Sequence, residues 1–432
     1  MTRALALIDG EHYAEVVVDA FRELPYEVAG AVALGGTEKL RGDEDYGVPL
    51  HETLEDGIGA SGAEVVIDLS DEPVVTARDR MRLASRTLAA GVPYVGADFR
   101  FDPVAFAPFE LPALAVIGSG KRVGKTAVAG HVARLLAQTR DVVVVAMGRG
   151  GPREPVVVEE APDVDALLAL ARAGQHAASD YLEDAALARV VTVGCRRCGG
   201  GLAGAPFVSN VEAGARAAAE RRPDLVLFEG SGAALPPVET ARRVLVAGGA
   251  QDPELVAGYL GAYRILLSDL VVLTGCEEPL VSAGALARLR ESIADVRADV
   301  PVIATVFRLR PVEPVAGRRV ALFTTAPEAV HGRLRETLES EHGAEVTLVS
   351  GNLSRRDALR GDLDLEEARE ADAYLVEIKA AAIDVVAEAG AERGIPVVPA
   401  DNAVEALPGE PNLDAALLAL ADEASREAVG AR

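Results

Sequence analysis

A glycine-rich segment with two lysines, residues 118–126 with the sequence GSGKRVGKT, could bind the phosphates of a nucleotide. Phosphate-binding loops follow the pattern G-x-x-x-x-G-K-[ST], which would require glycine where Ser119 stands. A loop one residue longer, beginning at Gly118, keeps the closing Gly-Lys-Thr. Its backbone N–H groups would point inward, and the following helix would add the positive end of its dipole. We therefore expect the cofactor-binding residues to be Gly118, Ser119, Gly120, Val123, Gly124, Lys125 and Thr126.

Lys125 and Thr126 are the residues of this loop whose side chains could contact the nucleotide phosphates and their metal ion. The Lys125 ammonium can reach β- and γ-phosphates, and the Thr126 hydroxyl can hold Mg²⁺. The alternative is an ordinary glycine turn, which leaves a Lys-Thr pair at the start of a helix without explanation.

Two further loops combine glycine with arginine. MGRGGPREP (147–155) and VGCRRCGGGLAG (193–204) each follow an expected strand. Glycines let such a loop adapt its shape. An arginine guanidinium binds phosphate through hydrogen bonds of fixed direction as well as through its charge. These loops therefore predict a second anionic ligand beside the nucleotide.

Cys195 and Cys198 have the spacing of a zinc half-site. A closed zinc site needs four ligands, and the remaining cysteine, Cys276, lies far along the chain. We expect neither zinc nor a thioredoxin-like redox function, because no redox fold pattern accompanies the pair.

Short apolar segments that alternate with helical patterns must position these residues. Strands are expected at ALAVIG (113–118), DVVVVAM (141–147), RVVTVG (189–194), DLVLFEG (224–230) and similar runs, with a helix over 126–138. Most of these strands end in glycine or polar residues, as at the ligand-binding edge of a parallel sheet. The fold class is α/β: a central P-loop NTPase-type parallel sheet flanked by Rossmann-like α/β units at both ends.

The length of 432 residues suggests several domains. We expect an N-terminal Rossmann-like domain at 1–110, a P-loop domain at 111–317 and a C-terminal α/β unit at 318–432 that packs with the N-terminal domain. The net charge of −24 argues against nucleic acid as a partner, and apolar runs are too short to cross a membrane. Three cysteines and an early acidic N-terminus predict a cytoplasmic protein, which we expect to be a homodimer.

The loop resembles those of dethiobiotin synthetase and its relatives, in which a glycine six residues before Gly-Lys-Thr opens the turn. In that group a strand ends in a Glu-Gly pair whose carboxylate helps to bind magnesium. Glu229 and Gly230, in DLVLFEGSG, occupy the matching place. The resemblance therefore implies Thr126 and Glu229 as metal ligands, and a strand-end carboxylate beside phosphates suits a hard cation.

The whole chain resembles the cyclic 2,3-diphosphoglycerate synthetase family. The stretches that carry the resemblance are ALIDGEHY (6–13), GGTEKL (35–40), GSGKRVGKT (118–126), GRGGP (148–152), CRRCGGG (195–201), FEGSG (228–232) and VEIKAAAIDVV (376–386). The resemblance implies that ATP drives closure of 2,3-diphosphoglycerate into its cyclic phosphoanhydride, releasing ADP and phosphate. It also implies Mg²⁺ and leaves K⁺ open as a second cation.

Residue roles follow from that implied reaction. Lys121, Arg122 and Lys125 would be catalytic, because they are placed to steady the transferring phosphoryl group. The substrate-binding candidates are Arg149, Arg196, Arg197, His12 and Lys379. His12 and Lys379 follow strands of the two flanking units, which would then close over the substrate.

Two other functions fit parts of the sequence. One is an ATP-dependent carboxylase or amide ligase of the dethiobiotin type, which would not require so many arginines. The other is a nucleotide-gated regulatory protein or metallochaperone, in which Cys195 and Cys198 would carry metal.

Overall fold

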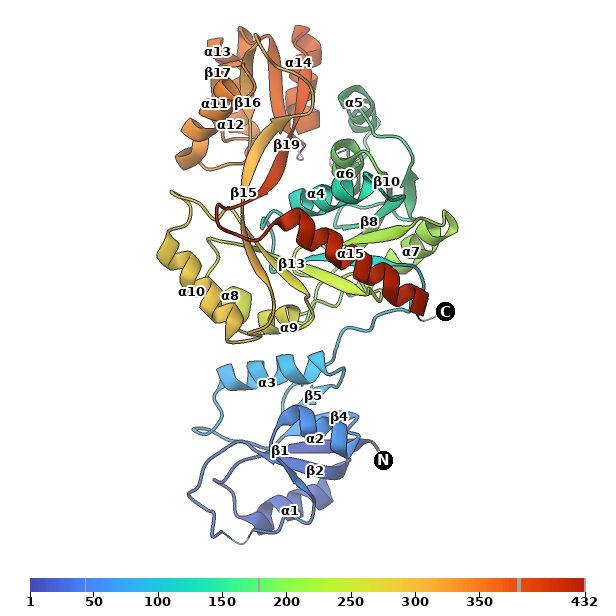
Figure 1. Ribbon diagram of the computed structural model, residues 1–432, viewed down its shortest axis with the longest axis vertical. Helices are drawn as coiled ribbons and strands as arrows, with labels where there is room; N and C mark the ends of the chain where they lie inside the picture. Colours follow the sequence, from blue (N-terminus) through green and yellow to red (C-terminus); the bar gives the residue numbers. More distant parts are fainter. Residues whose placement is uncertain (43, 178, 379–381, 431–432) are drawn as a thin grey trace.

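A computed structural model describes residues 1–42, 44–177, 179–378 and 382–430. Three units follow one another along its long axis (Figure 1): an N-terminal unit (3–101), a central unit (113–311) and a C-terminal unit (319–406). The fold is α/β, and the phosphate-loop segment lies in the central unit, as predicted.

The N-terminal unit is a six-stranded sheet in the order β3-β2-β1-β4-β5-β6. Neighbouring strands are parallel except β5 and β6, which are antiparallel. Its apolar strands β1 and β4 are buried almost throughout, as expected for strands with helices on both faces. The elements are β1 (Arg3–Ile8), α1 (Ala14–Glu23), β2 (Glu27–Ala33), β3 (Leu50–His51), α2 (Leu54–Ser61), β4 (Val65–Asp68), α3 (Ala77–Ala89), β5 (Tyr94–Val95) and β6 (Arg100–Phe101).

The central unit contributes the strands β11-β10-β8-β12-β7-β13-β14-β15 to a second sheet, with β7 in the middle. These strands are parallel apart from β11, and β9 adds an antiparallel pair to β10. The elements are β7 (Ala113–Gly118), α4 (Lys125–Ala137), β8 (Val142–Gly148), β9 (Val156–Val158), α5 (Val164–Arg172), α6 (Asp180–Ala188), β10 (Val191–Cys198), β11 (Val208–Ser209), α7 (Val211–Glu220), β12 (Leu225–Glu229), β13 (Arg242–Gly248), α8 (Pro253–Ala257), α9 (Gly261–Leu266), β14 (Leu270–Thr274), α10 (Ala283–Ala294) and β15 (Val302–Pro311).

The C-terminal unit continues the same sheet. Residues 305–311 of β15 pair antiparallel with residues 406–400 of β19, and β19, β18, β16 and β17 then follow as parallel neighbours. The elements are β16 (Arg319–Phe323), η1 (Glu328–Val330), α11 (His331–Ser340), β17 (Glu345–Ser350), α12 (Arg356–Leu363), α13 (Glu366–Arg369), β18 (Ala373–Glu377), η2 (Ala382–Ala387), α14 (Glu388–Arg393), β19 (Val397–Ala406) and α15 (Leu413–Gly430).

The two end units lie at opposite ends of the molecule, with the central unit between them (Figure 1). The expectation that the C-terminal unit packs with the N-terminal domain therefore differs from this structure. The physical reason is that β19 extends the central sheet, and that an apolar cluster, which includes Leu167, Leu182, Tyr374 and Ile383, joins α5 and α6 to the C-terminal unit.

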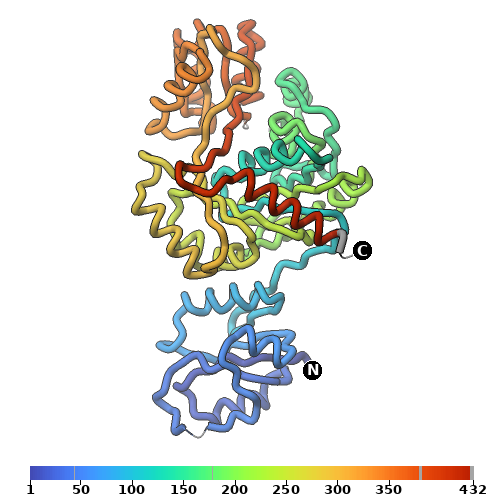
Figure 2. Tube along the Cα trace, in the orientation of Figure 1, coloured from blue at the N-terminus to red at the C-terminus, as the bar shows by residue number. Residues whose placement is uncertain are grey.

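The last helix, α15, returns to the central unit (Figure 2). Leu413, Leu417 and Ala421 of α15 are buried in the cluster that also contains residues of α4 and β7. Arg242 of β13 pairs with Glu423 of α15 at 2.9 Å between Nε and Oε2. The final helix thus covers the central sheet, although it follows the C-terminal unit in sequence.

The N-terminal unit joins the central unit through one length of chain and one packed face (Figure 2). Its helix α3 packs against α9, where the Ser85 hydroxyl donates to the carbonyl oxygen of Tyr259 at 3.1 Å. The Arg78 guanidinium of α3 donates to the Glu254 carboxylate of α8 at 2.8 Å. These contacts hold α3 against the segment that contains the helices after β13.

Two helical glycines provide a matched test of packing. A Cβ at Gly214 in α7 would lie 2.1 Å from the Cys195 sulfur of β10, whereas a Cβ at Gly361 in α12 would have no atom within 4 Å. We expect Gly214→Ala to lower the free energy of unfolding by about 1–3 kcal/mol, because it overpacks the helix against the sheet. Gly361→Ala should raise it by about 0.5–1 kcal/mol, because it restricts the unfolded chain.

Urea unfolding of the two variants beside the parent protein measures both changes. Equal effects of the two substitutions would contradict the close packing of α7 on β10.

Candidate functional site

The phosphate-loop segment connects the buried strand β7 to helix α4 at the carboxyl edge of the central sheet. Gly124 precedes the helix with a φ of 78°, a left-handed conformation that favours glycine. A Cβ at Gly124 would also lie 2.2 Å from the ring of Phe307 on β15. A Cβ at Gly118 would lie 2.7 Å from the carbonyl oxygen of Gly232. Neighbouring atoms therefore leave no room for a side chain at either glycine.

Ser119, which departs from the usual pattern, ties the loop to the strand beside it. Its backbone N–H donates to the Val246 carbonyl at 2.9 Å, and its hydroxyl donates to Oε1 of Gln251 at 2.6 Å. The same Gln251 oxygen accepts from the backbone N–H of Gly248 at 2.8 Å. A serine here thus gives the loop an extra anchor to the segment after β13.

Lys121 and Arg122 occupy the outer part of the loop, and both side chains are exposed. Arg122 has a φ of 62°, which is uncommon for a residue with a side chain and signals a backbone held by its surroundings. Exposed cations at this point can turn toward a bound anion.

Lys125, Thr126 and Glu229 form a buried polar cluster beneath the loop. The Lys125 ammonium makes an ion pair with Oε1 of Glu229, and the Thr126 hydroxyl donates to the same oxygen at 2.9 Å. Lys125 is 8% exposed and Glu229 only 1%. Burial alone would raise the pKa of the Glu229 carboxyl, but the Lys125 charge and the hydrogen bonds outweigh it, so the pKa is lowered. Glu229 is therefore an anionic strand-end carboxylate beside the loop.

Asp184 adds a second carboxylate that the sequence analysis missed. It lies on α6, is 2% exposed, and its pKa is raised well above the usual value by burial and then by the Glu229 charge. With both carboxyls ionised, neither oxygen of Asp184 nor Oε2 of Glu229 has a hydrogen-bond donor among the residues that the structure describes. No motif surrounds Asp184, which is one of three acids in the alanine- and leucine-rich stretch DYLEDAALA.

Arg197 lies beside the loop that follows Glu229. Its Nη1 donates to the Gly199 carbonyl and its Nη2 to the Ser231 carbonyl, each at 2.8 Å, while Nε has no partner in the described part of the chain. Burial and the nearby Arg149 charge lower the pKa of Arg197. Arg149 is exposed at the end of β8, so the structure brings these two predicted arginines together.

Arg196 takes a different position on β10. Successive residues of a strand point to opposite faces, so Arg196 and Arg197 diverge. The Arg196 side chain is exposed, and its backbone N–H donates to Oδ1 of Asn210 at 2.6 Å.

The cysteine pair is not arranged as a metal site. Cys195 is buried against α7, Cys198 is exposed, and burial raises the pKa of the Cys195 thiol to about 12. Among the described residues, no group of three or more His, Cys, Asp or Glu side chains could hold a metal ion.

His12 lies at the carboxyl edge of the N-terminal sheet and contacts that unit's own acids. Its Nδ1 is 2.8 Å from Oδ1 of Asp9, and its Nε2 is 3.6 Å from Asp71. Burial would raise the pKa of Asp9, but hydrogen bonds from His12 and from backbone N–H groups lower it. Lys379, the substrate-binding candidate of the C-terminal unit, lies outside the described residues.

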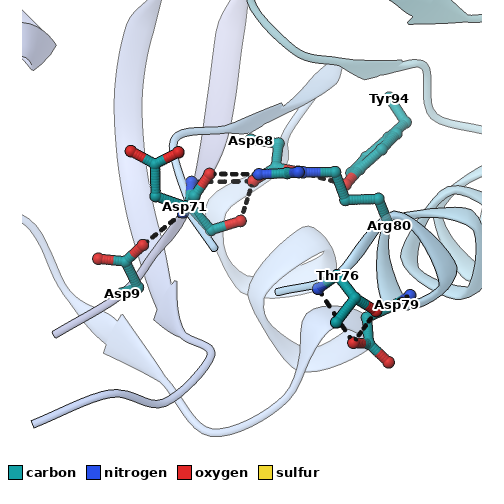
Figure 3. Close-up of polar contacts among 8 residues, drawn as sticks. Asp9, Asp68, Asp71, Thr76, Asp79, Arg80 and Tyr94 are labelled. Carbon is teal, nitrogen blue, oxygen red and sulfur yellow. Dashed lines mark hydrogen bonds and ion pairs between the residues drawn. The ribbon is translucent and has the colours of Figure 1, made fainter. Parts of the chain in front are cut away.

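Asp68 and Arg80 form a second polar network at this edge (Figure 3). Oδ2 of Asp68 accepts from Nε of Arg80 at 3.0 Å and from the Tyr94 hydroxyl at 2.6 Å. Oδ2 of Asp9 accepts from the backbone N–H of Asp71 at 2.5 Å (Figure 3). These acids are therefore bound to partners within the unit.

None of the helices in the described ranges has the length and apolar composition needed to span a bilayer.

Comparisons with known proteins cover nearly the whole chain. Three family models match: "Cyclic 2,3-diphosphoglycerate synthetase, N-terminal domain" at 3–102, the P-loop domain of the same family at 113–306, and its C-terminal domain at 311–403. A protein of Rubrobacter xylanophilus named cyclic 2,3-diphosphoglycerate synthetase is 54% identical and covers 100% of this chain and 99% of its own. A protein of the same name from Methanothermus fervidus is 42% identical and covers 93% and 92%.

Among solved structures, LpxK from Aquifex aeolicus in complex with ATP matches with a TM-score of 0.45 and 16% identity, over 74% of this chain and 90% of its own.

The thiols give a direct chemical test of the site's packing. The pKa of Cys195 is about 12 and that of Cys276 about 11, both raised by burial, so at pH 8 almost no thiolate exists at either position. We expect iodoacetamide to modify Cys198 in the native protein and to reach Cys195 and Cys276 only after unfolding. Peptide mass spectrometry reads the sites, and rapid native labelling of Cys195 would show that this packing is wrong.

Proposed function

Because the chain belongs to the cyclic 2,3-diphosphoglycerate synthetase family and is an ATP-dependent synthetase, we propose that the site around Lys125 closes 2,3-diphosphoglycerate into its cyclic phosphoanhydride. The observation that carries this placement is the meeting of a phosphate loop, a buried Lys125–Glu229 pair and two converging arginines at one edge of the central sheet. The dethiobiotin-type ligase and the metallochaperone have no comparable support, since full-length relatives bear the synthetase name.

ATP would bind along residues 118–126. The N–H groups at the start of α4 and the Lys125 ammonium would hold the phosphates, as helix N-termini and loop lysines do in nucleotide sites. Lys125 now contacts Glu229, so binding of ATP requires its ammonium to turn from that carboxylate to phosphate oxygens.

Thr126 and Glu229 would hold the Mg²⁺ that accompanies ATP. The donor set fits, because Mg²⁺ takes hydroxyl and carboxylate oxygens, and Oε2 of Glu229 has no partner in the described part of the protein. When bound, the ion would offset the charge of the β- and γ-phosphates. A role for K⁺ remains a prediction from the family resemblance.

Arg149 and Arg197 would gather the two phosphates of the substrate. The positive charges of the two arginines repel each other, and a bound polyanion would relieve that repulsion. The direction of the hydrogen bonds from each guanidinium would fix the orientation of the phosphates. Arg196, His12 and Lys379 remain further substrate-binding candidates, with His12 supplied by the N-terminal unit.

The reaction then balances in two steps. An oxygen of one substrate phosphate attacks the γ-phosphorus of ATP, the bridging bond to the β-phosphate breaks, and ADP leaves. An oxygen of the other substrate phosphate next attacks the phosphorus that now carries the added phosphoryl group, and inorganic phosphate leaves as the ring closes. Lys121, Arg122 and Lys125 would stabilise the negative charge that shifts during both steps.

The predicted homodimer and cytoplasmic location are retained as proposals that rest on the sequence.

The first test removes the loop lysine. Lys125→Ala should lower turnover by at least about 10²–10³-fold, because it removes an ammonium that stabilises the transferring phosphates. Incubation with MgATP and 2,3-diphosphoglycerate, followed by phosphorus NMR, detects the growing pyrophosphate signal of the product. Arg221→Ala is the control, since Arg221 pairs with Glu159 at the surface at 2.6 Å. Full activity of Lys125→Ala would end this assignment of the site.

A second test separates the substrate from ATP. Arg149→Ala should raise the KM for 2,3-diphosphoglycerate by about 10–100-fold, as expected for the loss of one charge-assisted contact. The KM for ATP should change little. Arg153→Ala provides a matched control, because Arg153 is an exposed arginine of the same loop. An equal rise in both KM values, or an equal effect of Arg153→Ala, would contradict the assignment of Arg149.

A further inference from the structure

We propose that Arg264 is a positioning residue for the synthetase reaction, because its buried guanidinium joins the two loops that orient Arg197. The inference rests on the proposed function and on the assignment of Arg197 to 2,3-diphosphoglycerate. Arg264 lies on α9, outside the motifs that the sequence analysis singled out. It is 4% exposed, so it acts through other residues and not on the substrate itself.

The first observation is a buried cation without a carboxylate partner. Among the residues that the structure describes, no Asp or Glu forms an ion pair with Arg264, and burial lowers the pKa of its guanidinium to about 10. A buried charge is strongly unfavourable unless it is paired or well hydrogen-bonded. An apolar side chain of similar size would fill the same space without that cost. The guanidinium is therefore explained by the groups that its hydrogen bonds hold.

The hydrogen bonds of the Arg264 guanidinium go to backbone carbonyls. Nε and Nη2 donate to Ala233 at 2.9 and 2.7 Å, Nη2 also donates to Leu202 at 3.2 Å, and Nη1 donates to Leu260 at 2.9 Å. Ala233 follows β12 and Leu202 follows β10, so one side chain joins the two loops after these strands. The planar guanidinium fixes the direction of each bond.

The two loops also bind each other beside Arg264. The Leu235 N–H donates to the Gly204 carbonyl at 2.8 Å. Gly204 has a φ of 97°, and a Cβ there would lie 3.0 Å from Nη2 of Arg264 and 3.0 Å from the Ala233 carbonyl oxygen. Glycine at this position therefore lets the loop after β10 approach the guanidinium closely.

A short turn carries this contact to Arg197. The Ala234 N–H donates to the Ser231 carbonyl at 3.0 Å, and the Ser231 N–H donates to the Ala234 carbonyl at 3.2 Å. The Ser231 carbonyl also accepts from Nη2 of Arg197 at 2.8 Å, while the Gly199 carbonyl accepts from Nη1 at 2.8 Å. Both carbonyls that orient Arg197 thus belong to the loops that Arg264 joins.

The experiment measures Tm and the steady-state kinetics of Arg264→Lys beside the parent protein. Lysine keeps the charge but cannot hold carbonyls of both loops in fixed directions. We expect kcat/KM for 2,3-diphosphoglycerate to fall by about 10–100-fold, chiefly through KM, because misplacing a binding group by about 1 Å can cost about 10²-fold. The KM for ATP should stay within about twofold, since the phosphate loop is anchored separately through Ser119 and Gln251.

Arg297→Lys is the matched control. Arg297 also donates to a backbone carbonyl just after α9, that of Ser268 at 2.7 Å. Within the described part of the chain its hydrogen bonds reach neither of the two loops. Its replacement should leave both KM values unchanged.

A double-mutant cycle distinguishes positioning from stability. If Arg264 acts through Arg197, adding Arg264→Lys to Arg197→Ala should lower kcat/KM for 2,3-diphosphoglycerate by no more than about twofold beyond Arg197→Ala alone. A purely structural role would lower Tm in both backgrounds and leave the kinetics of the folded protein unchanged.

The outcomes separate the inference from the function on which it rests. Independent losses that multiply in the double variant, an equal fall in kcat/KM for both substrates, or a lower Tm with unchanged kinetics would overturn the role of Arg264 alone. If Arg197→Ala leaves kcat/KM for 2,3-diphosphoglycerate unchanged, the substrate assignment of Arg197 fails and this inference falls with it. If the parent protein forms no cyclic product, the proposed function fails first.

A second variant covers the case in which Arg264→Lys does not fold. Gly204→Ala changes the same contact from the loop side and leaves the buried charge in place. It should also raise the KM for 2,3-diphosphoglycerate, and an unchanged KM in this variant would overturn the proposal.

Discussion

The buried ion pair between Lys125 and Glu229 is the interaction on which the arrangement of this site depends. Each charge is nearly excluded from solvent, and removing one partner of such a pair costs about 3–5 kcal/mol because the other is left uncompensated. The two residues are 104 positions apart in sequence. They meet because β12 pairs with β7, in a register that sets Glu229 opposite Val116 and so beside the start of the loop. The strand order of the central sheet is therefore a condition for the chemistry.

Close packing around two glycines adds a second constraint. Gly118 is enclosed by the Gly232 carbonyl, which belongs to the loop after β12, and Gly124 is enclosed by Phe307 of β15. The same strand β15 then pairs with β19 and holds the C-terminal unit to the central sheet. The phosphate loop, the segment after β12 and the connection to the C-terminal unit thus share one packed region.

Local features of this molecule could be predicted from the sequence, and so could one non-local contact that a family motif indicates, whereas the other non-local features could not. The strands around the loop, the helix after Gly124 and the pairing of Glu229 with the loop followed from apolar runs, glycine positions and a family motif. Asp184 could not be predicted, because nothing in the sequence distinguishes it from the other two acids of α6 until that helix is known to pack beside α4. The antiparallel pairing of β15 with β19 and the packing of α15 on the central unit could not be predicted either. Both depend on contacts between residues that lie far apart in the sequence.

The acidic edge of the N-terminal unit limits how that unit can take part in binding a polyanion. Asp9 and Asp68 are already satisfied, the first by His12 and backbone N–H groups, the second by Arg80 and Tyr94. A phosphate approaching His12 would have to compete with the Asp9 carboxylate 2.8 Å away. The central unit, by contrast, offers Arg149 and Arg197, and the two guanidinium Nη atoms of Arg197 donate to backbone carbonyls while its Nε has no partner in the described ranges. Under the proposed assignment of Arg149 and Arg197, the charge of the substrate is balanced chiefly by the central unit. The N-terminal unit contacts the central unit through Arg78, which donates to Glu254 of α8.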